Sequence, residues 1–176
     1  CEAAKAPVLC VVKADCYGHG AVPVANRLQS MGAPYFAVAT VPEAVELREN
    51  GIEKPIIILG YIDAADMDTV AEYGITAPVY DEETAELLSA AAVRTGRDIT
   101  VHYMTRIGFP SWEREETVRR ILECAKKPGL RSEGIFTHFA VADVPSGEKY
   151  TEMQYDRFRG VWEGLAENGL ALPLRH

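Results

Sequence analysis

Short apolar runs, separated by longer amphipathic segments, recur through the whole chain and constrain its fold more than any other feature. Most of the runs are continuous rather than alternating, which is typical of strands covered on both faces. Strand and helix alternate without a long linker, a pattern that predicts one α/β domain with a parallel sheet. The predicted strands are residues 8–12, 35–39, 55–59, 77–79, 99–102 and 134–139, and a last one starting near Leu172.

Signals for helix ends lie between the apolar runs. Thr40 and Glu43 have the spacing of a capping box, and Pro42 stands at the predicted first helical position. Such residues satisfy or avoid the backbone N–H groups that a helix leaves unpaired at its start. Further starts are predicted at Asp81 and Ser111, with helix ends at Gly51, Gly96 and Pro128-Gly129.

Seven strands in 176 residues fit two architectures. A closed eight-unit (β/α) barrel takes roughly 250 residues, or about 31 per unit. The chain would then hold about six and a half units and stop near the start of the seventh strand. An open doubly wound sheet fits as well, and periodicity alone does not decide between the two. Both architectures place functional groups at the carboxyl ends of the strands.

Composition excludes several function classes. The 18 Lys+Arg against 26 Asp+Glu give a net charge of −8, which argues against a nucleic-acid partner. The longest uncharged stretch, residues 28–42, contains Gly and Pro and is too short to span a membrane. The cysteines form no C-x-x-C pair, so neither a disulfide framework nor a metal site is predicted; they are Cys1, Cys10, Cys16 and Cys124. The reducing cytoplasm is therefore the expected location.

Lys13 follows the first apolar run directly. One interpretation is a surface lysine at a loop start. The other is a partly desolvated amine that acts as a nucleophile in Schiff-base chemistry. Tyr17 can bring a phenol to the same site, and Gly18 and Gly20 allow the backbone to approach a ligand closely. The glycine pair lacks the third glycine of a dinucleotide-binding motif.

Arg106 and His138 follow or lie in two later strands. Arg106 could form a planar fork for a carboxylate or phenolate oxygen, or an ion pair with a neighbouring carboxylate. His138 could be a hydrogen-bonded core histidine or a ring that packs on a bound cofactor. Asp143 is interpreted as a loop cap, and His19 and His102 as structural residues.

The segment VVKADCYGHGAVPVA closely resembles the cofactor-lysine motif of the alanine racemases, pyridoxal-phosphate enzymes built on a (β/α)₈ barrel. The segments FAVATVPEAVELRENGI, IIILGY, MTRIGFP and GIFTHFAVAD resemble later blocks of that family in the same order. The resemblance covers residues 7–176. It implies a partial TIM-type barrel over residues 1–176 that binds pyridoxal 5'-phosphate, without the family's C-terminal β domain.

The resemblance also implies roles for individual residues. Lys13 would form the internal aldimine with pyridoxal phosphate and act as the catalytic base on one face of the substrate. Tyr17 would hold the cofactor phosphate, and His138 would pack near the pyridine ring. Arg106 would contact the cofactor's phenolic oxygen and the substrate carboxylate, near the backbone of Met104. The implied reaction interconverts L- and D-alanine in a homodimer that serves D-alanine biosynthesis.

Two departures from the family pattern matter for function. The family's second base, a tyrosine of the C-terminal domain that acts in the partner's site, has no counterpart in these residues. The stretch before Met104 is about five residues short, which predicts a shortened fifth strand and leaves Arg106 without the lysine that supports it in many members. We therefore expect the 176-residue chain not to racemise alone. The alternatives are a non-catalytic module that binds pyridoxal phosphate, or another Schiff-base enzyme on a barrel, such as a lyase or decarboxylase.

Overall fold

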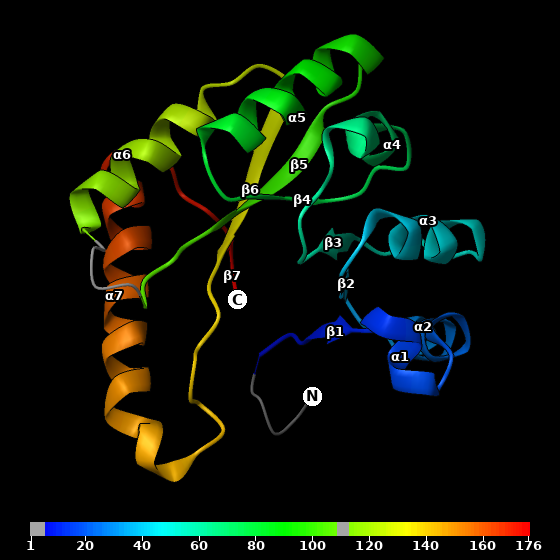
Figure 1. Cartoon of the computed structure of the whole chain (residues 1–176), viewed down its shortest axis with the longest axis horizontal. Coiled ribbons are helices and arrows are strands. Elements are labelled where there is room, and N and C mark those ends of the chain that lie inside the picture. Colours follow the sequence, from blue (N-terminus) through cyan, green and yellow to red (C-terminus); the bar gives the residue numbers. More distant parts are fainter. Residues whose placement is uncertain (1–5, 109–112) are drawn as a thin grey trace.

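Seven parallel strands pair in the order in which they occur in the chain (Figure 1). The computed structural model describes residues 6–108 and 113–176. A bridge between Ile57 and Thr76 joins a three-stranded and a four-stranded section. The strands are β1 Leu9–Val11, β2 Tyr35–Val38, β3 Ile56–Ile58, β4 Ala77–Val79, β5 Ile99–Met104, β6 Leu130–Phe136 and β7 Leu174–Arg175.

This strand order decides between the two predicted architectures. In a doubly wound sheet the order reverses at a switch point, whereas in a (β/α) barrel each strand lies beside its successor. The described strands run from β1 to β7 without a reversal, so the fold is α/β and a partial (β/α) barrel.

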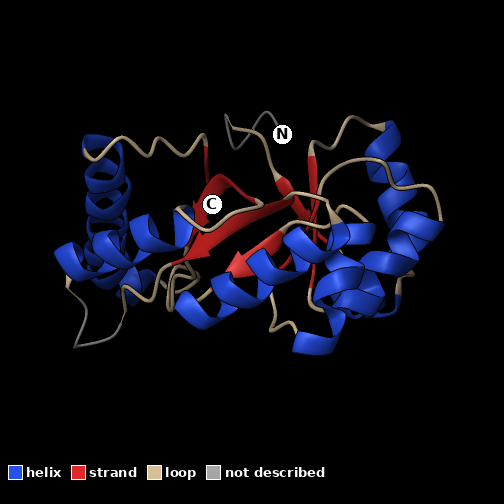
Figure 2. Ribbon diagram, turned by 90° about the horizontal axis from the view of Figure 1, so that it is seen from above, coloured by secondary structure: helices blue, strands red, loops and turns tan. Residues whose placement is uncertain are grey.

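Helices connect the strands and lie around them (Figure 2). Within the described ranges, no helix combines the length and apolar character that crossing a bilayer requires. The helices are α1 Lys13–Gly18, α2 Ala21–Ser30, α3 Val41–Glu49, α4 Met67–Glu72, α5 Glu82–Thr95, α6 Arg114–Ala125 and α7 Glu148–Glu167, with short 3₁₀ turns at Ala64–Asp66 and Pro145–Gly147.

The predicted helix signals act as expected at α3 and α5. Thr40 and Glu43 form a complete capping box at the start of α3, although Pro42 is the second helical residue and not the first. At α5, Asp81 accepts a hydrogen bond from the Thr84 N–H, and Gly96 ends the helix in the left-handed conformation. The predicted start at Ser111 lies outside the described residues, and Glu113 directly precedes α6.

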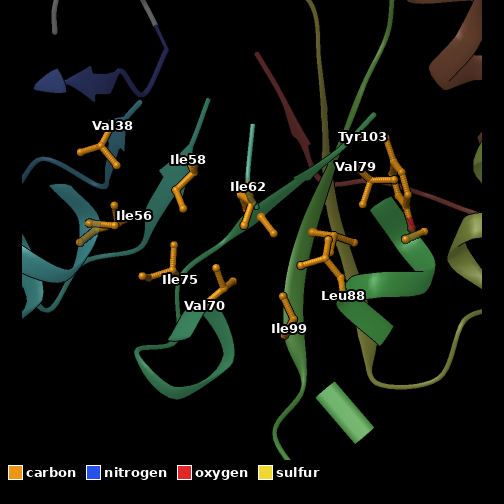
Figure 3. Close-up of a cluster of buried hydrophobic side chains, with 14 of the residues drawn as sticks. Val38, Ile56, Ile58, Ile62, Val70, Ile75, Val79, Leu88, Ile99 and Tyr103 are labelled. Atoms are coloured by element: carbon orange, nitrogen blue, oxygen red, sulfur yellow. The ribbon is translucent and has the colours of Figure 1, made fainter. Parts of the chain in front are cut away.

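The main core lies between the sheet and the helices (Figure 3). Ile58, Leu88 and Ile99 are each no more than 1% exposed, and they come from β3, α5 and β5. Burial of a whole aliphatic side chain contributes about 1.5–3 kcal/mol. The apolar runs of the sequence and one stripe of each helix therefore supply this core, as their patterns predict.

The expectation of a shortened fifth strand is wrong. β5 has six residues and pairs with both β4 and β6. The register shifts between Val101 and His102, and Glu133 is the extra residue on β6. A Cβ on Gly134 would lie 2.8 Å from the His102 ring, so glycine is required opposite that histidine. A bulge of this kind redirects a side chain, here the Glu133 carboxylate.

Candidate functional site

Lys13 begins a turn whose backbone is left-handed. Ala14, Asp15, Cys16 and Tyr17 all have φ between 50° and 53° and ψ between 38° and 48°. Each L-residue in this region costs roughly 1–2 kcal/mol, so four in succession cost about 4–8 kcal/mol. Strain of this size persists only where surrounding contacts hold it, and it concentrates at functional sites. The turn stands at the carboxyl end of β1, where the sequence places the candidate nucleophile.

Two carboxylates hold the ends of this turn. Asp15 accepts hydrogen bonds from the Ala21 N–H through Oδ1 at 2.7 Å and from the Gly20 N–H through its backbone oxygen at 3.0 Å. Glu43, which comes from α3, accepts a hydrogen bond from the Ala14 N–H through Oε1 at 2.9 Å. The left-handed turn is therefore connected both to α2, which follows it directly, and to α3, the next helix along the chain.

Lys13 and Tyr17 present unpaired polar groups from this turn. The Lys13 side chain is half-buried, and Tyr17 is 75% exposed. Within residues 6–108 and 113–176, neither side chain makes a hydrogen bond or an ion pair. The turn thus carries two reactive groups: an amine that can react with an aldehyde, and a phenol that can donate a hydrogen bond to an anion.

Met104 and Arg106 line a cavity of about 300 Å³ at the carboxyl ends of β4 and β5. Arg106 is exposed, and no carboxylate of the described residues lies within ion-pair distance of it, so the ion-pair interpretation gains no support. Hydrogen bonds from Thr84 hold the pKa of Asp81 below its ordinary value, and the charge of Arg106 acts in the same direction. Neither Lys13 nor Tyr17 lines this cavity.

His138 lies beyond the end of β6 and is exposed. The strand predicted at residues 134–139 is β6, which ends earlier, at Phe136. Next to it, the Thr137 hydroxyl donates to the Thr105 carbonyl at 3.0 Å, and the Thr137 N–H donates to the His176 carbonyl at 3.1 Å. The interpretation as a core histidine is therefore wrong. The bond between Thr137 and Thr105 joins the ends of β6 and β5. Arg106 directly follows Thr105 and His138 directly follows Thr137, so the two residues start from adjacent points of the backbone. The described residues record no contact between these two side chains and the Lys13 turn.

A buried polar network on the other face of the sheet was not predicted from sequence. Glu133 Oε2 accepts hydrogen bonds from the Tyr35 hydroxyl at 3.1 Å and from His102 Nε2 at 3.0 Å. His102 Nδ1 lies 2.8 Å from His176 Nε2, and Thr76 Oγ1 lies 2.7 Å from the Tyr35 oxygen. His102 is structural, as expected. The available signal for the rest was a glutamate directly before the apolar end of β6.

Burial changes the titration of this network. It raises the pKa of Tyr35 above its ordinary range and lowers that of His102. Burial, together with the His102 charge, lowers the pKa of His176 to about 4. Both histidines are therefore neutral near pH 7.

The donor set at the carboxyl edge fits a phosphorylated aldehyde such as pyridoxal phosphate. Lys13 offers the amine for the aldehyde, and Tyr17 a hydroxyl for the phosphate. Arg106 offers a guanidinium for an anionic oxygen, and His138 an exposed ring at a strand end. Among the described residues, no group of three or more His, Cys, Asp or Glu side chains is arranged to hold a metal ion.

Comparison with known proteins gives one consistent family. The family model for the alanine racemase N-terminal domain matches residues 1–176. Alanine racemase 1 of Oceanobacillus iheyensis is 37% identical over 98% of this chain, which covers 46% of that protein. The chain thus spans about half the length of the curated relatives it matches.

Solved structures agree with this result. Alanine racemase of Clostridium difficile 630 in complex with cycloserine has a TM-score of 0.89 and 38% identity, over 94% of this chain and 46% of that chain. Histidine racemase of Leuconostoc mesenteroides has a TM-score of 0.78 and 28% identity, over 96% of this chain and 45% of that chain. The fold is therefore shared by racemases whose names give different amino acids.

Proposed function

Because the chain belongs to the alanine racemase N-terminal domain family, we propose that it binds pyridoxal phosphate at Lys13 and forms part of an amino-acid racemase acting on alanine. The observation that carries the proposal is the left-handed turn that follows Lys13. A chain does not retain about 4–8 kcal/mol of backbone strain beside an ordinary surface lysine without a use for the resulting geometry.

In this proposal each residue at the carboxyl ends of the strands has its own role. Lys13 holds the cofactor through its amine, Tyr17 donates to the phosphate, and His138 lies near the ring. Arg106 holds anionic oxygens of the cofactor and of the substrate carboxylate, next to the Met104 backbone. When bound, the cofactor withdraws electrons and acidifies the substrate Cα–H bond. The freed Lys13 amine then takes or returns the proton at Cα on one face.

Inversion needs an acid/base group on the opposite face, since a single base returns the proton to the side it left. We propose that this group is a tyrosine outside the 176 residues, acting across a homodimer. The 176-residue chain would then exchange the α-proton of one antipode without inverting it.

Addition of pyridoxal phosphate, followed by borohydride reduction and peptide mass mapping, tests the cofactor site. We expect a visible absorbance band and a reduced adduct on Lys13. K13A should lose both while keeping its circular dichroism spectrum, and K149A, which removes an exposed amine from α7, should keep both. The absence of an adduct on Lys13 in the unmodified chain would overturn the proposal.

The reaction is tested separately by incubating the loaded chain with amino acids in D₂O. Loss of the α-proton signal from one antipode of alanine, without formation of the other, is the expected result. Alanine, serine and histidine compared side by side define the substrate, because the neighbouring structures include a histidine racemase. Cofactor binding without any exchange would favour the non-catalytic binding module. Measurable racemisation by the 176-residue chain would contradict the opposite-face assignment.

A further inference from the structure

Glu43 binds more backbone groups than its helix cap requires. In a capping box, the glutamate at the third helical position returns to the N-cap N–H. Glu43 does so, since Oε2 accepts from the Thr40 N–H at 3.2 Å and from the Ala39 N–H at 2.7 Å. Its other oxygen, Oε1, accepts from the Ala14 N–H at 2.9 Å. That third bond reaches 29 residues back along the chain and does nothing for α3.

The Ala14 N–H belongs to the peptide group that immediately follows Lys13. On the other side of Lys13, the Val12 carbonyl accepts from the Cys16 N–H at 3.2 Å, and the Val12 N–H, one peptide group earlier, donates to the Ala37 carbonyl of β2 at 2.9 Å. Lys13 is thus held between two fixed peptide groups, and its Cα–Cβ direction follows from them. The turn itself binds the peptide group before Lys13, the sheet binds Val12 one step earlier, and the Glu43 carboxylate binds the peptide group after Lys13.

We propose that Glu43 is a positioning residue for Lys13: its Oε1 fixes the peptide between Lys13 and Ala14 in the orientation that starts the left-handed turn and presents the Lys13 amine to pyridoxal phosphate. This inference rests on the proposed function of Lys13. The turn contains no glycine before Gly18, so its own residues do not favour the conformation and an outside acceptor is required. A carboxylate suits the task because it accepts through both oxygens at once and strengthens each bond with its charge.

Glu43→Gln separates this role from helix capping. Glutamine also completes a capping box, so α3 keeps its cap through the amide oxygen. The amide NH₂ then faces the Ala14 N–H, and two donors cannot bond. We expect E43Q to keep its helical circular dichroism but to bind pyridoxal phosphate about tenfold more weakly, the loss typical of one charge-assisted hydrogen bond. Fast hydrogen exchange at Ala14, with the Ala39 amide still protected, should accompany the loss.

Three variants distinguish positioning from a general effect on the helix. Thr40→Ala weakens the same cap but leaves Ala14 bonded, and Glu46→Gln removes the same charge from the next turn of α3; both should bind the cofactor like the unmodified chain. Ala14→Gly, combined with E43Q, should recover part of the affinity, because glycine adopts the left-handed region without the Cβ penalty. A loss of helix cap alone would not be rescued in this way.

The measurement is cofactor titration by the visible band, with the yield of borohydride-trapped adduct on Lys13, for all five proteins. An adduct in the unmodified chain, a selective loss in E43Q and partial recovery in A14G/E43Q support the inference. Equal affinity of E43Q and the unmodified chain would overturn it while leaving the proposed function intact, as would an equal loss in T40A. No adduct in the unmodified chain would overturn the proposed function, and this inference with it. If E43Q fails to fold, rapid exchange of the Ala14 amide in the unmodified chain would still overturn the inference.

Discussion

The two faces of the sheet are stabilised in different ways. The face toward the helices packs apolar side chains such as Ile58, Leu88 and Ile99, without polar partners to satisfy. The opposite face holds the buried His102 and the half-buried Glu133 in a hydrogen-bonded network. An apolar core responds mainly to changes of volume, whereas a buried polar network depends on every member keeping its partner. The same sheet should therefore react differently to substitution and to pH on its two faces.

The direction of each hydrogen bond in the network follows from Glu133. An ionised carboxylate only accepts, so Tyr35 and His102 Nε2 donate to it. His102 Nδ1 is then an acceptor in the neutral ring and takes the bond from His176 Nε2–H. Thr76 likewise donates to the Tyr35 oxygen, which has used its own proton. All the bonds run toward one carboxylate.

The largest effect is expected on the apolar face, for Leu88→Ala. Leu88 is fully buried in α5, and its truncation removes apolar burial and leaves a cavity, at a cost of about 3–4 kcal/mol in the free energy of unfolding. Val93→Ala, in the same helix but 64% exposed, should change stability by less than about 0.5 kcal/mol. Urea unfolding of both variants measures the difference. Similar losses for the two would mean that this face is not a tightly packed core.

The second effect is a pH dependence that arises from the polar face. In the folded chain the pKa of His176 lies near 4 and that of His102 is also lowered, so the unfolded state binds more protons as the pH falls below about 6.5. Stability contributed by the neutral rings is therefore complete above that pH and is lost progressively toward pH 4. For His176 the loss amounts to at most about 3 kcal/mol.

Thermal unfolding between pH 7 and pH 4.5 measures the slope of stability against pH. His176→Gln should flatten it, because the variant has no ring to protonate, and His19→Gln, which alters an exposed histidine, should leave it unchanged. Equal slopes in the unmodified chain and in H176Q would show that the polar face does not control stability in acid.

Removal of the central acceptor should have the third largest effect. Glu133→Ala leaves His102 Nε2–H and the Tyr35 hydroxyl without their shared partner, at a cost of about 2–3 kcal/mol. Glu133→Gln should cost less than about 1 kcal/mol, since one amide oxygen can accept both bonds as Oε2 does. Chemical denaturation of the pair tests whether acceptor geometry or negative charge matters. An equal loss of stability in both variants would show that the negative charge of Glu133, and not the position of its acceptor oxygen, stabilises the network.

Much of the apolar face could be predicted from sequence, because burial on both sides of a strand leaves a local signature. Continuous apolar runs located every strand, and Asp81 and Gly96 marked both ends of α5 correctly. The strand ends were predicted less well: β6 ends at Phe136, so His138 lies past it, and the Thr137 hydroxyl between them bonds to the Thr105 carbonyl beyond β5. No local pattern encodes such a bond.

The polar features were harder to predict for the same reason. The left-handed turn begins at Ala14, a residue that ordinarily favours right-handed helix, so propensity gives the wrong conformation. The capping box identified one function of Glu43 but not its bond to Ala14, whose partner lies 29 residues away. The bulge at Glu133 depends on the pairing of β5 with β6, and register is a property of two strands together.

The smallest effect is expected at the edge of the network, for Tyr35→Phe. The variant keeps the buried ring but loses the hydroxyl, and Thr76, which is 3% exposed, is left with an unpaired hydroxyl. We expect a loss of about 1–1.5 kcal/mol. Thr76→Val alone should cost less, because Tyr35 still donates to Glu133.

The double variant Y35F/T76V is the sharper measurement, because it removes the orphaned Thr76 hydroxyl along with its partner. Replacing both members of a buried pair by apolar groups of similar shape is close to neutral, so the double variant should be more stable than Y35F alone. Denaturation of the four proteins gives the coupling between the two residues. Strictly additive losses of stability would mean that the two hydroxyls act independently. This edge of the polar face would then not depend on its members keeping their partners.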